Sequence, residues 1–242
     1  MNVAERRKLT DVARGSAPAD LVIRGGTLLN VYTGELYPAN VATRGERIAY
    51  VGARVDMIGA RTTVLEATGQ VLVPGYIDPH VHPAHVTTPS ALARFVLPRG
   101  TTSVVADTLQ LLELGGSRAF LRAADALAGA PLKFYWMIRP HAQSRTMDEP
   151  RRYPLRDLVR SLAHPRAVAI GEVTRWPDAW SGLPELLRRL ALAPTRLPRV
   201  EGHTAGAAAD KLAAIAAAGF TSDHEPITAR GCASERTRSR SG

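Results

Sequence analysis

Two histidines, His80 and His82, stand two positions apart in a run that reads as the end of a β-strand. Side chains at positions i and i+2 of a strand point to the same side, so both imidazoles can present a ring nitrogen to one metal ion. A His-x-His pair alone arises by chance and would then be two unrelated histidines on a strand edge. The preceding run Val73–Asp78 makes the pair more specific. We therefore interpret His80 and His82 as metal ligands.

Three more side chains of metal-binding type follow later strand-like runs. Glu172 comes directly after the apolar run Ala167–Gly171, where a carboxylate can bridge two metal ions, and His203 and His224 end the next two runs. Each alone is more often a solvated charge or a surface histidine. Together with His80–His82 they place imidazole or carboxylate at four strand ends, a ligand set that suits zinc, iron or manganese.

Weaker candidates for substrate contact lie near the same strand ends. His141 follows the third run of this series and is as easily a structural residue as a substrate contact. The full set of weak substrate-binding candidates is His85, Asp107, His141 and Glu225.

The part of the chain before the candidate ligands divides into two stretches. Residues 1–19 read as a short helix and linker, and residues 20–74 read as short strands separated by turns. Val41–Thr43 and Ile48–Val51 are expected to pair as a hairpin. Regular turns between short strands predict a small β-sandwich or half-barrel, with the sandwich preferred as the fold of this domain.

From residue 75 to residue 228, strand-like and helix-like runs alternate, which predicts βα units around a parallel sheet. Such an α/β pattern suits a TIM-like (β/α)8 barrel, here with only about six βα units where a complete barrel has eight. Barrel enzymes place their sites at the carboxyl ends of the strands, which is where the candidate ligands lie. The expected strands are Tyr76–His82, Thr102–Asp107, Leu132–Ile138, Ala167–Val173, Arg199–Thr204 and Phe220–Glu225. The expected helices are Pro89–Leu97, Ser117–Leu127, Leu155–Leu162, Leu183–Leu192 and Ala207–Ala218.

The last segment, residues 229–242, breaks this pattern. It has almost no apolar residues and no period, so its composition predicts disorder, and it follows a strand with no seventh or eighth strand behind it. We hypothesise a truncated or frameshifted gene product, or a fragment.

Composition and charge exclude several classes of protein. No run of eighteen apolar residues is present and the polar N-terminus lacks an apolar core, so neither a membrane span nor a signal peptide is expected. The single cysteine, Cys232, excludes an internal disulfide and favours a cytoplasmic location. The net charge is +9, but only three of the 31 basic residues are lysines and no nucleic-acid-binding motif accompanies the charge. A nucleic-acid partner is therefore not expected.

Taken together, residues 5–228 resemble the amidohydrolase superfamily and, within it, the adenine deaminases. The β-rich start followed by Val-Pro-Gly-Tyr-Ile-Asp-Pro-His-Val-His is similar to the superfamily, and further segments in the same order are similar to the adenine deaminases. These segments are Asp20–Gly26, Asn30–Glu35, Val96–Asp107, Gly171–Val173, Gly202-His203 and Thr221–Glu225.

The resemblance implies hydrolytic removal of the 6-amino group of adenine, which yields hypoxanthine and ammonia from a purine-like small molecule. It also implies a binuclear divalent metal centre, commonly iron or manganese, with zinc as a third choice. Glu172 and His224 are the catalytic candidates within that centre. The residues that match the family's ligand positions are His80, His82, Glu172, His203 and His224.

Two departures from the family pattern bear on the substrate. The family's Ile-Glu-Ser-Ser after the paired histidines is here Pro83–Val86, and its Ala-Asp-Pro-His-Glu is here Ala106–Gln110. Both changes remove acidic or imidazole groups from the expected pocket, so the ring need not be adenine. The aspartate expected at the end of an eighth strand has no counterpart in the sequence.

Other functions remain open at this point. One is a truncated, inactive relative that only binds metal, and another is an amidohydrolase that acts on a cyclic amide or an N-acetyl sugar. Glu172 stands where the carboxylated-lysine branch of the superfamily has its lysine, which argues against that branch. A sheet of six strands would also expose two edges, which favours pairing with a second copy in a homo-oligomer.

Overall fold

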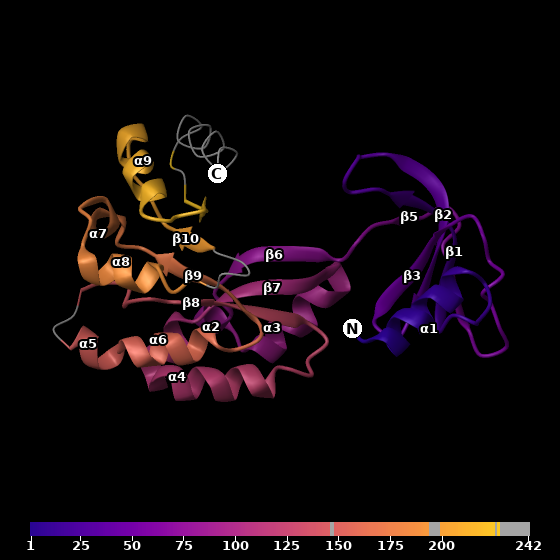
Figure 1. Ribbon diagram of the computed structural model, residues 1–242, viewed down its shortest axis with the longest axis horizontal. Helices are drawn as coiled ribbons and strands as arrows, with labels where there is room; N and C mark the ends of the chain where they lie inside the picture. The colour runs from indigo at the N-terminus through magenta and orange to yellow at the C-terminus, as the bar shows by residue number, and fades with distance from the viewer. Residues whose placement is uncertain (146–147, 194–198, 226, 228–242) are drawn as a thin grey trace. The chain divides into compact units, whose positions relative to one another are not determined.

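The computed structural model describes residues 1–145, 148–193, 199–225 and 227. The chain divides into two compact units, Met1–Pro74 and Gly75 onward (Figure 1). The division lies where the sequence pattern changes from short strands to alternating strands and helices. The segment 229–242, for which disorder is predicted, lies outside the described residues together with its cysteine, Cys232.

The first unit packs one helix on one sheet. The sheet has the order β3 (Arg47–Gly52), β2 (Leu36–Arg44), β1 (Leu21–Leu29), β4 (Thr63–Glu66), and β5 (Val71–Leu72) also pairs with β1. β2 and β3 form the predicted antiparallel hairpin, whereas β4 and β5 run parallel to β1. Helix α1 (Val3–Ala13) packs against β2 and β3. The second layer is therefore this helix, where a β-sandwich would have a second sheet.

Local sequence explains the helix and its packing. The side-chain Oδ1 of Asn2 accepts a hydrogen bond from the backbone N–H of Glu5, and the Glu5 carboxylate accepts one from the N–H of Asn2. This reciprocal capping satisfies two N–H groups that the first helical turn leaves without partners. Val12 on the helix is then buried against Val22 of β1 and Met57.

The second unit contains a curled sheet of six parallel strands, as predicted for a partial (β/α)8 barrel (Figure 1). Each strand pairs in parallel with the next one along the chain. The strands are β6 (Tyr76–Val81), β7 (Thr101–Asp107), β8 (Lys133–Ile138), β9 (Ala167–Val173), β10 (Val200–Gly202) and β11 (Ser222–Asp223). Because all six run the same way, their carboxyl ends meet at one edge of the sheet.

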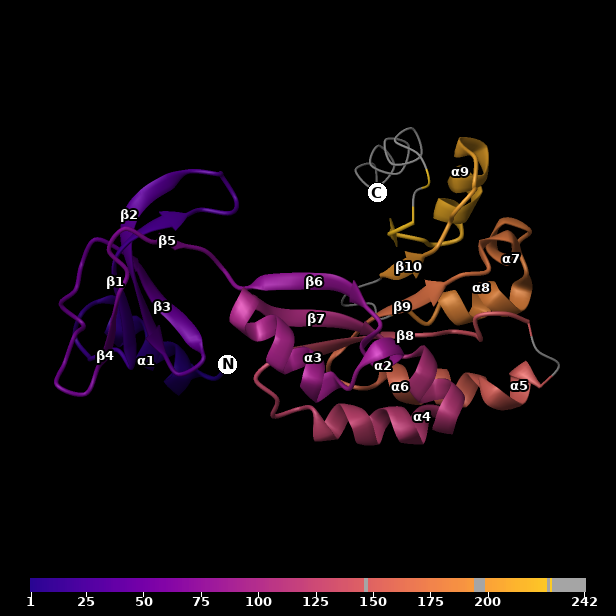
Figure 2. The ribbon, with the colours of Figure 1, turned by 180° about the vertical axis from the view of Figure 1, so that it is seen from behind.

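Helices connect successive strands, and Figures 1 and 2 show α3, α4 and α6 on one side of the sheet. The core between these layers is aromatic at its centre, where the ring of Phe120 on α4 meets that of Trp136 on β8 edge-on at 5.4 Å. The helical segments are α2 (Pro83–Val86), α3 (Pro89–Val96), the 3-10 turn η1 (Leu97–Arg99), α4 (Leu109–Ala126), α5 (Glu149–Arg152), α6 (Leu155–Leu162), α7 (Trp176–Trp180), α8 (Pro184–Leu190) and α9 (Ala209–Ala217).

The element boundaries differ from the predicted ones in three ways. The helix expected to start at Ser117 begins at Leu109. Gly115 and Gly116 interrupt it with non-helical backbone, so the helical period of its first half does not continue into the second. The short segments α2, α5 and α7 have too few residues to show a helical period. β10 and β11 are shorter than the runs that predicted them. Within the described residues, no helix is long and apolar enough to cross a membrane.

Candidate metal centre

His80 and His82 come together at the carboxyl end of β6. His80 lies in the strand and His82 is the residue before α2. Their Nε2 atoms are 3.0 Å apart, and these same atoms lie 3.8 Å and 3.6 Å from Oε2 of Glu172. The predicted pairing of the two imidazoles on one side of the strand is therefore present in the structure, and a buried carboxylate faces both.

Glu172 occupies the middle of the centre, near the end of β9, and is 3% exposed. Its second oxygen, Oε1, lies 2.5 Å from Nδ1 of His203 and 3.5 Å from Nε2 of His224. The carboxylate thus faces one pair of imidazoles with each oxygen. This arrangement depends on Gly171, because a Cβ at that position would lie 2.7–2.9 Å from atoms of Glu201 and Met137.

His203 and His224 follow the short strands β10 and β11. The backbone N–H of His203 donates to the carbonyl of Val173 at 3.2 Å, which extends the pairing of β10 with β9 up to the site. The ring of His224 stacks on that of His80 at 3.8 Å between centroids. Side chains from β6, β9, β10 and β11 are therefore gathered at one point on the sheet edge.

Sequence reasoning missed Glu201, which lies on β10 two residues before His203. Its Oε1 is 2.9 Å from Nδ1 of His224, and its other oxygen accepts a hydrogen bond from Ser222. A carboxylate that holds the distal nitrogen of a histidine fixes which ring nitrogen is free to bind a metal. The spacing of Glu201 and His203, two apart on a strand, was the available signal.

Arg139 and its partners were also missed. Arg139 follows β8 and is 2% exposed. Its Nε donates to Oδ2 of Asp107 at 2.7 Å, its Nη2 to Oε2 of Glu172 at 2.6 Å and its Nη1 to Oε1 of Gln143 at 2.7 Å. The signal for Arg139 was its position directly after a strand, the same position that singled out the candidate ligands.

Burial and neighbouring charges shift the pKa values of several side chains in the centre. Burial raises the pKa of Glu172, but His224, Arg139 and His203 outweigh burial and lower it to about 2. Burial lowers the pKa of His224, but its contacts with Glu172 and Glu201 raise it to about 10. Burial, followed by neighbouring charges, lowers the pKa of His80, and burial also lowers that of His82.

The weak substrate-binding candidates lie in different surroundings. Asp107 reaches the centre, but Arg139, the N–H of Glu172 and the N–H of Leu109 already donate to its oxygens. His85 is exposed and stacks on the ring of His82 at 4.6 Å. Glu225 is exposed, and its backbone N–H donates to Asp223.

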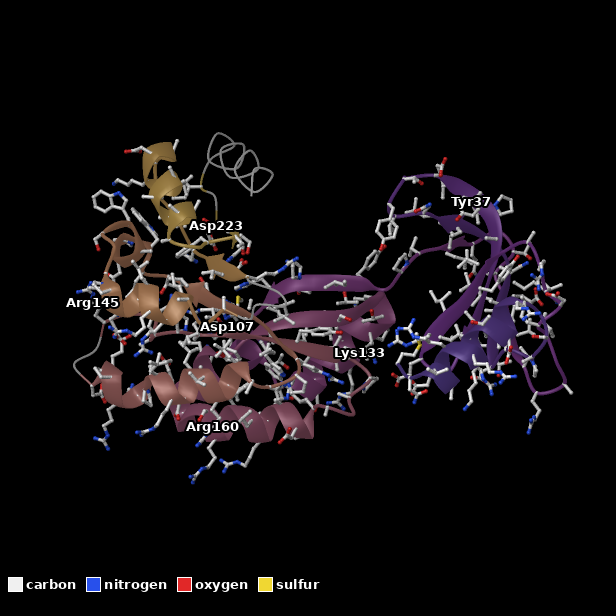
Figure 3. The ribbon with its side chains drawn as sticks, viewed as in Figure 1. Tyr37, Asp107, Lys133, Arg145, Arg160 and Asp223 are labelled. Atoms are coloured by element: carbon white, nitrogen blue, oxygen red, sulfur yellow. The ribbon has the colours of Figure 1, made fainter. Side chains whose placement is uncertain are left out.

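His141 lies beside a separate cleft. It is 2% exposed, and its Nδ1 lies 2.7 Å from the carbonyl oxygen of Ala142, to which it can donate. The cleft has a volume of about 600 Å³ and is lined by His141, Arg145, Arg175, Asp178, Leu186 and Arg189, among others. Figure 3 labels Arg145, which lines this cleft, and Asp107, which lies beside the candidate metal centre, and the two residues are well apart.

The donor set fits a divalent metal centre. Three groups of side chains each bring three ligand atoms within 4.8 Å of one another, namely His80-His82-Glu172, Glu172-His203-His224 and His80-Glu201-His224. Nδ1 of His203 lies 2.5 Å from a carboxylate oxygen yet makes no hydrogen bond with it, an arrangement expected of two ligands of one ion. Imidazole with carboxylate is a ligand combination for zinc, iron or manganese.

Comparison with known proteins identifies relatives along nearly the whole chain. No family model matches. The chain is 30% identical over 222 residues to the putative adenine deaminase YerA of Bacillus subtilis, which is 92% of this chain and 38% of that protein. It is 31% identical over 228 residues to the adenine deaminase of Kosmotoga olearia, again 38% of that protein. The chain thus spans about two fifths of the length of these curated relatives.

Solved structures share the fold at lower sequence identity. The N-acyl-D-glutamate deacylase of Bordetella bronchiseptica, solved with zinc and a phosphonate inhibitor, matches 92% of this chain and 56% of its own with a TM-score of 0.61 and 20% identity. The β-aspartyl dipeptidase of Fervidobacterium islandicum matches 93% of this chain and 63% of its own with a TM-score of 0.66 and 16% identity. The chain therefore has an amidohydrolase fold, and the curated proteins that it resembles in sequence are adenine deaminases.

Proposed function

We propose that this protein contributes the metal centre for hydrolytic deamination of an amino-heterocycle, with adenine as the first candidate and hypoxanthine and ammonia as the products. The observation that carries the proposal is the convergence of four imidazoles and one buried carboxylate at the carboxyl ends of parallel strands. The residues concerned are His80, His82, Glu172, His203 and His224.

The side chains divide into two half-sites that share Glu172. His80 and His82 face its Oε2, and His203 and His224 face its Oε1. A divalent ion held by such ligands lowers the pKa of a bound water and so supplies hydroxide near neutral pH. Manganese, iron and zinc are the candidate ions, and the resemblance to the adenine deaminases implies a site for two of them.

Proton handling is assigned to the carboxylate of Glu172, which lies beside His224. Deamination adds the water oxygen to the ring carbon, breaks the carbon–nitrogen bond and requires one proton to reach the departing ammonia. His224 has Glu201 at Nδ1 and Glu172 at Nε2. Without a bound ion these contacts raise its pKa to about 10, with burial acting in the opposite direction. With an ion on Nε2, the ring carries its single proton on Nδ1. The pair Glu172 and His224 is therefore proposed as catalytic, and Glu201 as the group that keeps a proton on Nδ1.

A second candidate substrate is an amino-heterocycle other than adenine. The observation that favours it is the position of Asp107, whose oxygens accept hydrogen bonds from Arg139, Glu172 and Leu109 and whose side chain is fully buried. Ala84 also stands where the family resemblance leads one to expect a glutamate. A small-molecule substrate is common to both candidates, and a homo-oligomer and a cytoplasmic location stay predictions.

The test combines metal content with ammonia release. The purified chain is reconstituted with Mn(II), Fe(II) or Zn(II) and offered adenine and a panel of related amino-heterocycles, with and without a chelator. Bound metal and chelator-sensitive ammonia release support the proposal, and the preferred ring decides between the two substrates. His203→Asn should abolish the activity, whereas His164→Asn, outside the centre, should not. Bound metal with no turnover on any ring favours the inactive metal-binding alternative.

A further inference from the structure

Arg139 places a fixed positive charge inside the proposed metal centre. Its guanidinium is 1% exposed and is held by three hydrogen bonds of 2.6–2.7 Å to Glu172, Asp107 and Gln143. Because each of its three nitrogens is engaged and little of the side chain meets solvent, this arginine cannot swing out as a surface arginine can. Any ion that enters the centre must therefore share it with this charge.

The guanidinium acts on one half-site more than on the other. It donates to Oε2 of Glu172, the oxygen that faces the imidazoles of His80 and His82. Oε1 of the same carboxylate faces His203 and His224 and carries no hydrogen bond from Arg139. A cation bound through Oε2 would compete with Arg139 for the same lone pairs and would be repelled by it at short range. A cation bound through Oε1 avoids the competition.

The formal charge of the centre points the same way. Among the described residues, the carboxylates of Asp107, Glu172 and Glu201 and the guanidinium of Arg139 leave a net charge of −2 when the imidazoles are neutral, as metal-binding imidazoles are. One divalent ion balances this charge, whereas a second would leave an excess of positive charge in a largely buried site. Burying an uncompensated charge is strongly unfavourable.

We propose that this centre binds one divalent ion tightly, through Oε1 of Glu172, His203 and His224, and that Arg139 weakens a second ion at His80 and His82. This inference rests on the proposed metal centre and deepens it, because it names the residue that sets the number of ions. Arg139 is in this view a positioning residue, which acts on the metal through Glu172 and never touches the substrate.

The test is a metal titration of the full chain by isothermal calorimetry, with the retained ions counted by elemental analysis after buffer exchange. The wild-type protein should retain one Zn(II) per chain, and any second ion should bind at least about tenfold more weakly. Arg139→Met, which removes the charge, should retain two. Arg139→Lys keeps the charge and should retain one, so the lysine variant separates charge from loss of packing.

Arg189→Met is the matched control, because Arg189 is another buried arginine, bonded to the carbonyls of Pro140 and Tyr153 and to Glu185, away from the centre. It should retain one ion. Two ions of similar affinity in the wild-type protein overturn the inference and leave the metal centre standing. One ion in a folded Arg139→Met variant, verified by near-ultraviolet circular dichroism, also overturns it. A folded wild-type chain that binds no metal overturns the proposed function itself, which is a different result.

The position of the tight ion is tested with single substitutions. His203→Ala should weaken the retained ion by about a hundredfold, whereas His82→Ala should change its affinity by less than about tenfold. The reverse order would assign the tight ion to His80 and His82 and overturn the proposal. Co(II) in place of Zn(II) gives a visible spectrum whose intensity reports the coordination number, independently of any catalytic activity.

Discussion

Oε1 of Glu201 lies 2.9 Å from Nδ1 of His224, and the opposite nitrogen of the same ring points to Glu172 at 3.5 Å. The carboxylate thereby selects the tautomer of His224 that carries its proton on Nδ1 and leaves Nε2 as the ligand atom. Such outer carboxylates also make the ligating nitrogen more basic. Glu201 is thus part of the candidate metal centre, and its spacing of two residues from His203 was the signal for it in the sequence.

Glu201→Gln should lower the affinity for Zn(II) by about tenfold to a hundredfold, because the amide keeps an acceptor for Nδ1 but loses the negative charge. The affinity is measured by competition with a chromophoric chelator. Ser222→Ala is the control, since it removes the other hydrogen bond to the Glu201 carboxylate without touching His224. Equal losses in the two variants would contradict a specific role for the contact between Glu201 and His224.

A second prediction concerns the backbone that presents Glu172. Gly171 has a φ of +153°, and a Cβ there would approach the Cβ and carbonyl oxygen of Glu201 and the sulfur of Met137 within 2.7–2.9 Å. Gly171→Ala should therefore destabilise the fold by about 2 kcal/mol, as a strained backbone position does, and should also weaken metal binding. Urea unfolding without metal measures the first effect and chelator competition the second.

Gly129→Ala is the control for the glycine experiment. A Cβ at Gly129 meets no atom within 4 Å, and the residue does not have a positive φ. This substitution should leave stability within about 1 kcal/mol of the wild-type value or raise it slightly, because alanine restricts the unfolded chain. A loss at Gly129 as large as that at Gly171 would show that the effect is not specific to the metal centre.

A third prediction links metal binding to stability. An ion that binds only the folded chain raises its free energy of unfolding by about 2.7 kcal/mol when the free metal is a hundred times its dissociation constant. Thermal unfolding at increasing Zn(II) should show a midpoint that rises with metal and returns to its first value with chelator. In the double variant His203→Ala, His224→Ala the midpoint should not respond to metal, and an unchanged response would place the bound ions elsewhere.

Much of the second unit was predictable because its strands carry local signals. The apolar runs that form β7, β8 and β9 are bounded by turns and alternate with helical stretches. Each such run can be recognised from a short segment of sequence. The continuation of α4 across its break was not predictable in this way, since Gly115 and Gly116 read as a loop. After the break, the backbone N–H of Ser117 donates to Asp157 of α6.

The candidate ligands were predictable and their environment was not. The five candidate ligands each lie at or just after the carboxyl end of a strand, so a parallel sheet alone places them on one edge. They are His80, His82, Glu172, His203 and His224. The network of Arg139 with Asp107 joins residues 32 positions apart in the sequence. Its formation depends on the register between neighbouring strands β7 and β8, in which Asp107 pairs with Met137. Neither the sequence of β7 nor that of β8 indicates this register by itself.

The last prediction concerns acid stability and His141. Burial, followed by the charge of Arg175, lowers the pKa of His141 to about 4, against an ordinary value of 6.5. The folded chain therefore binds fewer protons than the unfolded chain between pH 4 and pH 6.5, so the free energy of unfolding rises with pH across this window and levels off above it. The size of the effect from this one group is about 3 kcal/mol.

His141→Asn should remove this part of the pH dependence, because asparagine can keep the donor to Ala142 but does not titrate. Urea unfolding of both proteins between pH 4 and pH 7.5, with chelator present to exclude any contribution from bound metal, gives the difference directly. The wild-type protein should gain stability relative to the variant as the pH rises from 4 to 6.5. Parallel curves would mean that His141 is accessible to protons in the folded chain, and the cleft beside Arg175 would then be hydrated around the imidazole.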